Sequence, residues 1–339
     1  MPSPLLMLEA MSAAGVAAVL VCLLCAWPWG RHVTSLSPQA EGLPSLSPRG
    51  GGSGWGETRR QVGFVLAAAA GIFVGCWFLG IRPHWPPRED IDRLLIVLFP
   101  AVFIVEFRAA VSSRAPWLVW ALRVVIAVGA ARLLLHDSIY LSDLAGPGSR
   151  KWTPSESWII LGGLAVALTV EWVLMTHLIR RAPGRSVPVA LAFACAGAGI
   201  TVMLSGYASG GQIGLAVAAA LVGATLASLV LPGAPDVESL VGIGVVGLFA
   251  QLAIGHFFGE LKTGHALLLF LAPLLCWVPE LSLVRRLRPT VRGVARVILT
   301  AVPVAVALFL AQKNFVTDSS RNSPGDKEPT LEDYMNYGK

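Results

Sequence analysis

Residues 187–231 read VPVALAFACAGAGITVMLSGYASGGQIGLAVAAALVGATLASLVL and contain no Asp, Glu, Lys or Arg. Each half of this stretch is close to the ~20 apolar residues that a helix needs to cross a ~30 Å hydrocarbon core. The stretch therefore predicts two consecutive transmembrane helices, at 187–207 and 210–231.

The same pattern continues on both sides of this stretch. The chain of 339 residues is 55% hydrophobic and 14% charged, whereas soluble domains are typically ~45–50% apolar and ~25% charged. We therefore predict an all-α, polytopic transmembrane bundle over 1–311, with no soluble domain and about ten spans (nine to eleven). Besides the two spans above, the predicted spans are 8–28, 61–81, 93–112, 116–136, 156–179, 237–257, 264–283 and 291–311.

Two segments have a different composition. Residues 29–60 are rich in Ser, Pro and Gly, which predicts a flexible loop between the first two spans. Residues 312–339 are polar and predict a disordered tail. The first apolar block has no basic residue before it and ends in Trp27-Pro28-Trp29, so we expect a retained span and not a signal peptide.

Basic residues predict the orientation in the membrane. The formal net charge is +6, but in a membrane protein this excess mostly marks loop orientation, so no nucleic-acid partner is expected. The positive-inside rule then places both termini outside the cytoplasm, in a multi-pass protein of the cell membrane. The residues on the predicted cytoplasmic side are Arg31, Arg49, Arg59, Arg60, Arg114, Arg180, Arg181, Arg185, Arg285, Arg286, Arg288, Arg292 and Arg296.

Small residues predict which helices pack closely. Two sets recur at intervals of four and share one helix face, which lets backbones approach within a membrane. A G-x-G-x-x-G sequence at 242–247 matches the dinucleotide fingerprint in form, but it lies inside a span, so we interpret it as close packing. The two sets are Gly63, Ala67, Gly71 and Gly75, and Ala216, Ala220, Ala224 and Ser228.

Three ionisable residues fall at membrane depth, where each costs at least ~2.5–3.5 kcal/mol on insertion scales. Spans 93–112 and 116–136 form a tight hairpin, so Glu106 and Arg123 lie at nearly equal depth. Counting inward from the ends of spans 116–136 and 156–179 places Glu171 close to that depth. We therefore expect a buried Glu106–Arg123–Glu171 cluster. It is either a proton- or ion-coupled site or gate, or a structural ion cluster that fixes the register of three helices.

A second polar group falls on the predicted outer face. Imidazole with carboxylate is a ligand set for divalent metals, and His256, Glu260 and His265 are the candidate site. The spacing matches no compact metal motif, so solvated loop charges are the alternative. The remaining members of the group are His84, Glu89, Asp90, Asp92, His136, Asp137 and Asp143.

The cysteines indicate packing and not chemistry, because all of them fall inside apolar blocks. They are Cys22, Cys25, Cys76, Cys195 and Cys276.

Function is predicted only as a class. The absence of a phosphate-binding loop excludes ATP-driven transport by this chain alone, and we expect no cofactor. The leading hypothesis is passage of a small solute or ion through the bundle, and an enzyme is less expected. The alternatives are a structural or assembly subunit with membrane-protein partners or a second copy, and a membrane enzyme with a His/acid site in the outer loops.

Overall fold

The computed structural model describes residues 3–26, 53–111, 115–141, 151–231, 237–281 and 288–321. This part of the chain is an all-α bundle with no strand, and ten of its helical segments are long and apolar enough to span a membrane. The predicted fold class is therefore confirmed. The helices are α1 (Pro4–Ala26), α2 (Ser53–Phe78), α3 (Asp90–Arg93), α4 (Phe99–Val111), α5 (Pro116–Leu134), α6 (Pro154–Arg181), α7 (Ser186–Leu204), α8 (Ala208–Val230), α9 (Ser239–Phe257), α10 (Thr263–Leu271) and α11 (Pro289–Arg321).

Prolines change the helix type in two spans. In the third span, a π-helical turn at Leu94–Leu98 joins α3 to α4, directly before Pro100. Proline has no N–H to donate and its ring crowds the preceding turn, which disturbs the regular ladder. In the ninth span, α10 continues as a 3-10 helix over Ala272–Glu280, which contains Pro273 and Pro279.

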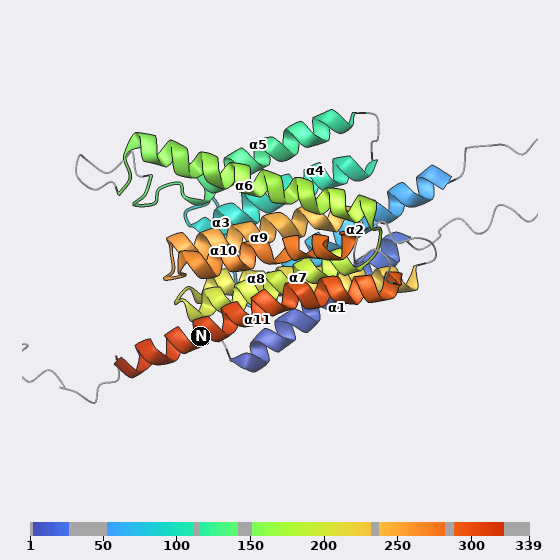
Figure 1. Ribbon diagram of the computed structural model, residues 1–339. Helices are drawn as coiled ribbons and strands as arrows, with labels where there is room; N and C mark the ends of the chain where they lie inside the picture. The colour runs from blue at the N-terminus through green and yellow to red at the C-terminus, as the bar shows by residue number, and fades with distance from the viewer. Residues whose placement is uncertain are drawn as a thin grey trace, which may run out of the picture.

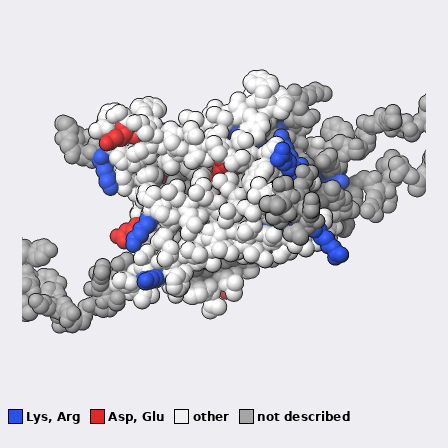
Figure 2. Space-filling model, viewed as in Figure 1, with Lys and Arg blue, Asp and Glu red and all other residues white. Residues whose placement is uncertain are grey.

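The helices run back and forth, so the bundle has two ends (Figure 1). We call the end at which α1 begins and α11 ends the terminal face, and the opposite end the arginine face. Between the two ends, the visible surface is almost entirely uncharged (Figure 2). The basic residues described on the arginine face are Arg59, Arg60, Arg108, Arg180, Arg181, Arg185, Arg288, Arg292 and Arg296.

The long connections lie largely outside the described residues. Residues 27–52, the core of the predicted loop, are outside them, and α2 begins at Ser53. Helix α11 extends to Arg321, so the first part of the predicted tail is helical, and 322–339 are outside the described residues. Arg31, Arg49, Arg114, Asp143, Arg285 and Arg286 also fall outside them.

The two small-residue faces pack against each other. A Cβ atom added to Gly71 would lie 2.8 Å from the Cβ of Ala220, and one added to Gly75 would lie 2.8 Å from the Cβ of Ala216. Helix α1 completes this contact, because the same atom at Gly71 would lie 2.8 Å from the carbonyl oxygen of Ala14. Backbones that approach this closely gain dispersion contacts, which drive helix association where lipid supplies no hydrophobic force.

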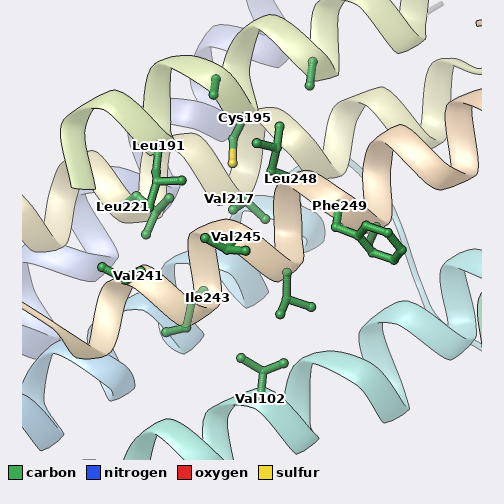
Figure 3. Packing of buried hydrophobic residues seen from close by; sticks show 14 of the residues in the cluster. Val102, Leu191, Cys195, Val217, Leu221, Val241, Ile243, Val245, Leu248 and Phe249 are labelled. Carbon is green, nitrogen blue, oxygen red and sulfur yellow. The ribbon is translucent and has the colours of Figure 1, made fainter. Parts of the chain in front are cut away.

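Helix α9 is the most completely buried of the candidate spans and forms the centre of the bundle. Its residues Val241, Ile243 and Val245 belong to one buried apolar cluster with residues of α4, α7 and α8 (Figure 3). The G-x-G-x-x-G glycines serve close packing, as predicted. A Cβ atom added to Gly244 would lie 3.2 Å from the Leu191 side chain, and one added to Gly247 would lie 3.0 Å from the Val217 side chain. The first glycine of the motif, Gly242, contacts the ion pair described next.

Candidate functional site

A buried ion pair joins α4 to α5 near the arginine face. The Arg123 Nε atom donates to Glu106 Oε1 at 3.1 Å, and Nη2 donates to Oε2 at 2.8 Å. The two helices are antiparallel and only four residues, 112–115, separate them in the sequence. Pro116 lies in the first turn of α5, where a missing N–H costs nothing. At ~1.5 Å per residue, Glu106 lies about 8 Å and Arg123 about 10 Å inside their helix ends. Two members of the predicted cluster are thus brought together.

The ion pair is almost completely buried. Glu106 is 0% exposed and Arg123 is 2% exposed. The guanidinium carbon lies 4.8 Å from the ring centroid of Trp120 and 5.5 Å from that of Trp172. Aromatic faces attract a cation while excluding water, so they lower the cost of holding this charge inside the membrane.

Gly242 brings the backbone of α9 against the carboxylate. A Cβ atom added at this position would lie 2.2 Å from Glu106 Oε1 and 2.8 Å from Trp172 Cζ2. Only a residue without a side chain leaves room for both groups. Gly242 is therefore part of the ion-pair site, and it is the member of the glycine motif that has this additional role.

A polar cavity of about 400 Å³ extends from the arginine face to this ion pair. At its outer end, Arg180 forms a second ion pair with Glu238, in which the Arg180 Nε atom lies 2.9 Å from Glu238 Oε2. The cavity is large enough for a small solute, since ligand pockets are typically ~300–1,000 Å³. It is lined by Thr58, Gln61, Glu106, Ala109, Ala110, Val111, Pro116, Val119, Trp120, Arg123, Arg180, Glu238 and Ser239.

Glu171 does not join the ion pair. It is 1% exposed, and neither of its carboxyl oxygens has a hydrogen-bond partner among the described residues. Its neighbour in sequence, Trp172, does reach the site by stacking on Arg123. The third member of the predicted cluster is therefore buried, but it forms no bond with the Glu106–Arg123 pair.

Sequence reasoning missed four residues of this site. Trp120 lies one helical turn before Arg123, so its position could have been inferred from the spacing. Trp172 and Gly242 reach the pair only because α6 and α9 cross it. Glu238 pairs with Arg180 across a long sequence separation, for which a single sequence contains no signal.

The outer polar residues are dispersed into separate contacts at the terminal face. Within the described part of the chain, no three His, Cys, Asp or Glu residues are grouped as metal ligands. The His256 Nδ1 atom lies 2.7 Å from the Leu261 carbonyl oxygen, so this ring nitrogen is engaged in a local hydrogen bond. The proposed set of His256, Glu260 and His265 therefore does not converge.

Other members of that outer group stabilise the loops. Both carboxylate oxygens of Asp90 accept from the Tyr207 hydroxyl, at 2.9 and 3.0 Å. Burial, and then the nearby Asp90 charge, raise the pKa of Tyr207 above its usual range. Asp92 accepts from the backbone N–H groups of His84, Arg88 and Glu89. These are structural contacts that hold 84–92 against the helix ends.

The fold and this site define an integral, multi-pass membrane protein with a charge pair at the inner end of a polar cavity. No protein-family model, no curated protein and no solved structure matches this chain.

Replacing Gly242 with Ala tests the packing of the site. We expect a loss of about 1–3 kcal/mol in the free energy of unfolding, because the new methyl group overlaps the Glu106 carboxylate. Thermal unfolding in detergent measures the change, with Gly129→Ala, which meets nothing within 4 Å, as the matched control. The cost should fall when Gly242→Ala is combined with Glu106→Ala. An equal cost in both backgrounds would show that the carboxylate is not the group displaced.

Proposed function

We propose that the protein passes a small polar solute or ion across its membrane through the helical bundle. In this proposal the 400 Å³ cavity is the entry vestibule and the Glu106–Arg123 pair is the gate at its inner end. The observation that supports it most is that a polar cavity reaches from the bundle surface to a charge pair at membrane depth. A pair that served packing alone would not need a polar approach.

The closed state of the gate follows from its contacts. Both carboxylate oxygens of Glu106 are engaged, and the ring of Trp120, which also lines the cavity, stacks on the guanidinium. Beyond the pair, Val102, Val105 and Phe99 are buried and apolar, so no polar path continues along α4. Passage then requires Arg123 and Trp120 to move, which breaks two charge-assisted hydrogen bonds.

Orientation is part of the proposal. The basic residues of the arginine face predict that this face is cytoplasmic, and that both termini are outside. The cavity would then open to the cytoplasm in this conformation. A second cavity, of about 320 Å³, lies at the terminal face between α6, α9 and α10, and its lining includes Ala167.

Cysteine accessibility tests the vestibule. In a background with the native cysteines replaced, Ala109→Cys should react rapidly with a membrane-impermeant thiol reagent, because Ala109 lines the cavity. The matched control is Ile104→Cys on the same helix, where a 67% exposed side chain faces outward and lipid should protect the thiol. Reagent added to the cytoplasmic side should label Ala109→Cys, and reagent added outside should not.

Several outcomes would contradict the proposal. Protection of Ala109→Cys in folded protein, at the level of Ile104→Cys, would mean a dry bundle in which the ion pair is structural. Labelling of Ala109→Cys only from outside would mean that the arginine face is not cytoplasmic.

A further inference from the structure

An apolar cavity opens near the terminal face, between α2, the chain that follows it and the third span. Its volume is about 590 Å³. Phe73 and Trp77 belong to its lining and are 68% and 60% exposed, so the cavity opens sideways, toward the lipid around the bundle. Among the described residues of its lining, Arg82 is the only charged one, and we call it the Arg82 cavity. The lining residues used below are Ala69, Trp77, Arg82, Pro100 and Phe103.

The Arg82 cavity is about as deep as one leaflet of a membrane. At ~1.5 Å per residue, Ala69 at its inner end lies about 14 Å from the end of α2 at Phe78. On the opposite wall, Phe103 lies about 20 Å from the start of α3 at Asp90. Half of a ~30 Å hydrocarbon core is about 15 Å. A transmembrane helix of a partner would cross the whole core, so a cavity of this depth fits one lipid acyl chain and not a helix.

The third span is irregular where it forms the wall of this cavity. Leu95 and Ile96 belong to its π-helical turn, Pro100 follows that turn, and all three line the cavity. Turns of this kind inside helices occur frequently at functional sites. Deeper in, Phe99 and Phe103 stack with ring centroids 5.9 Å apart, and both also belong to the lining. The wall therefore presents apolar surface over the depth that an acyl chain would occupy.

Arg82 lies at the outer end of the cavity without an anionic partner. Its guanidinium carbon lies 5.5 Å from the ring centroid of Trp77, and its side chain forms no ion pair or hydrogen bond with any described residue. Asp90 and Asp92, which follow in the sequence, are bonded to the Tyr207 hydroxyl and to backbone N–H groups instead. Tryptophan is enriched at the level of the lipid headgroups. The stacking therefore holds an unpaired cation at headgroup level, above an apolar cavity.

We propose that the Arg82 cavity binds a glycerophospholipid of the leaflet at the terminal face. One acyl chain fills the apolar cavity, and the Arg82 guanidinium donates to the phosphate oxygens. A guanidinium can give a phosphate two parallel hydrogen bonds, which are stronger than bonds between neutral groups. The free charge thus complements the phosphate, and the depth of the cavity complements the chain. This site is at the opposite end of the bundle from the 400 Å³ cavity, so it does not depend on passage of a solute.

Native mass spectrometry of a lipid titration tests the phosphate contact. Delipidated protein in detergent is titrated with palmitoyl-oleoyl-phosphatidylglycerol, and one tightly bound molecule per chain is expected. Arg82→Gln should weaken this binding at least about tenfold, the typical effect of losing a hydrogen bond to a charged group. The matched control is Arg88→Gln, which removes the same charge from an exposed position of the same face, outside the cavity lining. Unchanged binding in Arg82→Gln, or an equal loss in both variants, would overturn the site.

The acyl chain has its own variant and competitor. Ala69→Phe fills the inner end of the cavity and should also weaken lipid binding at least about tenfold, because the displaced CH₂ groups lose their burial. Ala121→Phe, at an exposed position of α5, is the matched control and should leave binding unchanged. Inorganic phosphate at millimolar concentration should not displace the lipid. Displacement by phosphate, or full affinity in Ala69→Phe, would mean an anion site without a chain and would overturn the proposal. So would a dimer without bound lipid, in which a second copy covers this face.

Discussion

Arg123→Gln is expected to lower the free energy of unfolding by about 3–5 kcal/mol, the usual cost of removing one partner of a buried ion pair. The cause is the Glu106 carboxylate, which is 0% exposed and would lose both of its charge-assisted hydrogen bonds. The stacking of the guanidinium on Trp120 and Trp172 is lost as well. Reversible unfolding in mixed detergent micelles measures the change.

A double variant distinguishes the cost of leaving the Glu106 charge unpaired from the cost of losing the other contacts of Arg123. Glu106→Gln combined with Arg123→Gln should recover much of the loss, because two neutral amides leave no unpaired charge inside the bundle. Arg132→Gln, on an exposed position of the same helix, is the control and should change stability little. If Arg123→Gln were no more costly than Arg132→Gln, the ion pair would not be buried as the structure has it.

Gly211→Ala is expected to have the second large effect. Its new Cβ atom would lie 2.3 Å from the Gly199 carbonyl oxygen and 2.9 Å from the Met203 backbone nitrogen. These are backbone atoms of α7, so no side chain can rotate to relieve the overlap, and the two helices must separate. We expect a loss at or above the ~1–3 kcal/mol that is typical of overpacking, measured as a fall in the thermal unfolding midpoint.

The matched control for this variant is Gly162→Ala. A Cβ atom at Gly162 meets nothing within 4 Å on the exposed face of α6. Ala has a higher helix propensity than Gly, so stability should stay the same or rise slightly. Equal midpoints for Gly211→Ala and Gly162→Ala would mean that α7 and α8 do not approach as closely as their backbones do here.

The helix contacts of this bundle differ in how far the sequence predicts them. Small residues at intervals of four predicted a close-packing face on α2 and another on α8, because that spacing identifies a helix face without any knowledge of its partner. That the two faces meet each other is shown only by the structure. The contact of Gly199 with Gly211 lies on helices that were predicted, but the pairing of these two glycines depends on how α7 and α8 cross. A helix face is a local property, whereas a crossing point is set by both partners.

The ion-pair site divides in the same way. The short hairpin between α4 and α5 made the meeting of Glu106 with Arg123 predictable, since a tight turn forces equal depth on both sides. Depth alone also suggested Glu171, but depth does not say in which direction a side chain points. Rotation of α6 about its axis decides that Trp172, and not Glu171, contacts Arg123.

Hydropathy alone was enough to predict the all-helical class and the ten spans, because a bilayer leaves a chain few ways to satisfy its backbone hydrogen bonds. Residue spacing along those spans was enough to predict the close-packing role of the α9 glycines and the equal depth of Glu106 and Arg123. Tertiary structure alone decided the polar cavity, the pairing of Arg180 with Glu238, the approach of Gly242 to the carboxylate and the isolation of Glu171. Each of these depends on the rotation and crossing of helices that are distant in sequence. Such relations arise from the packing of whole helices against one another, and no local pattern in the chain encodes them.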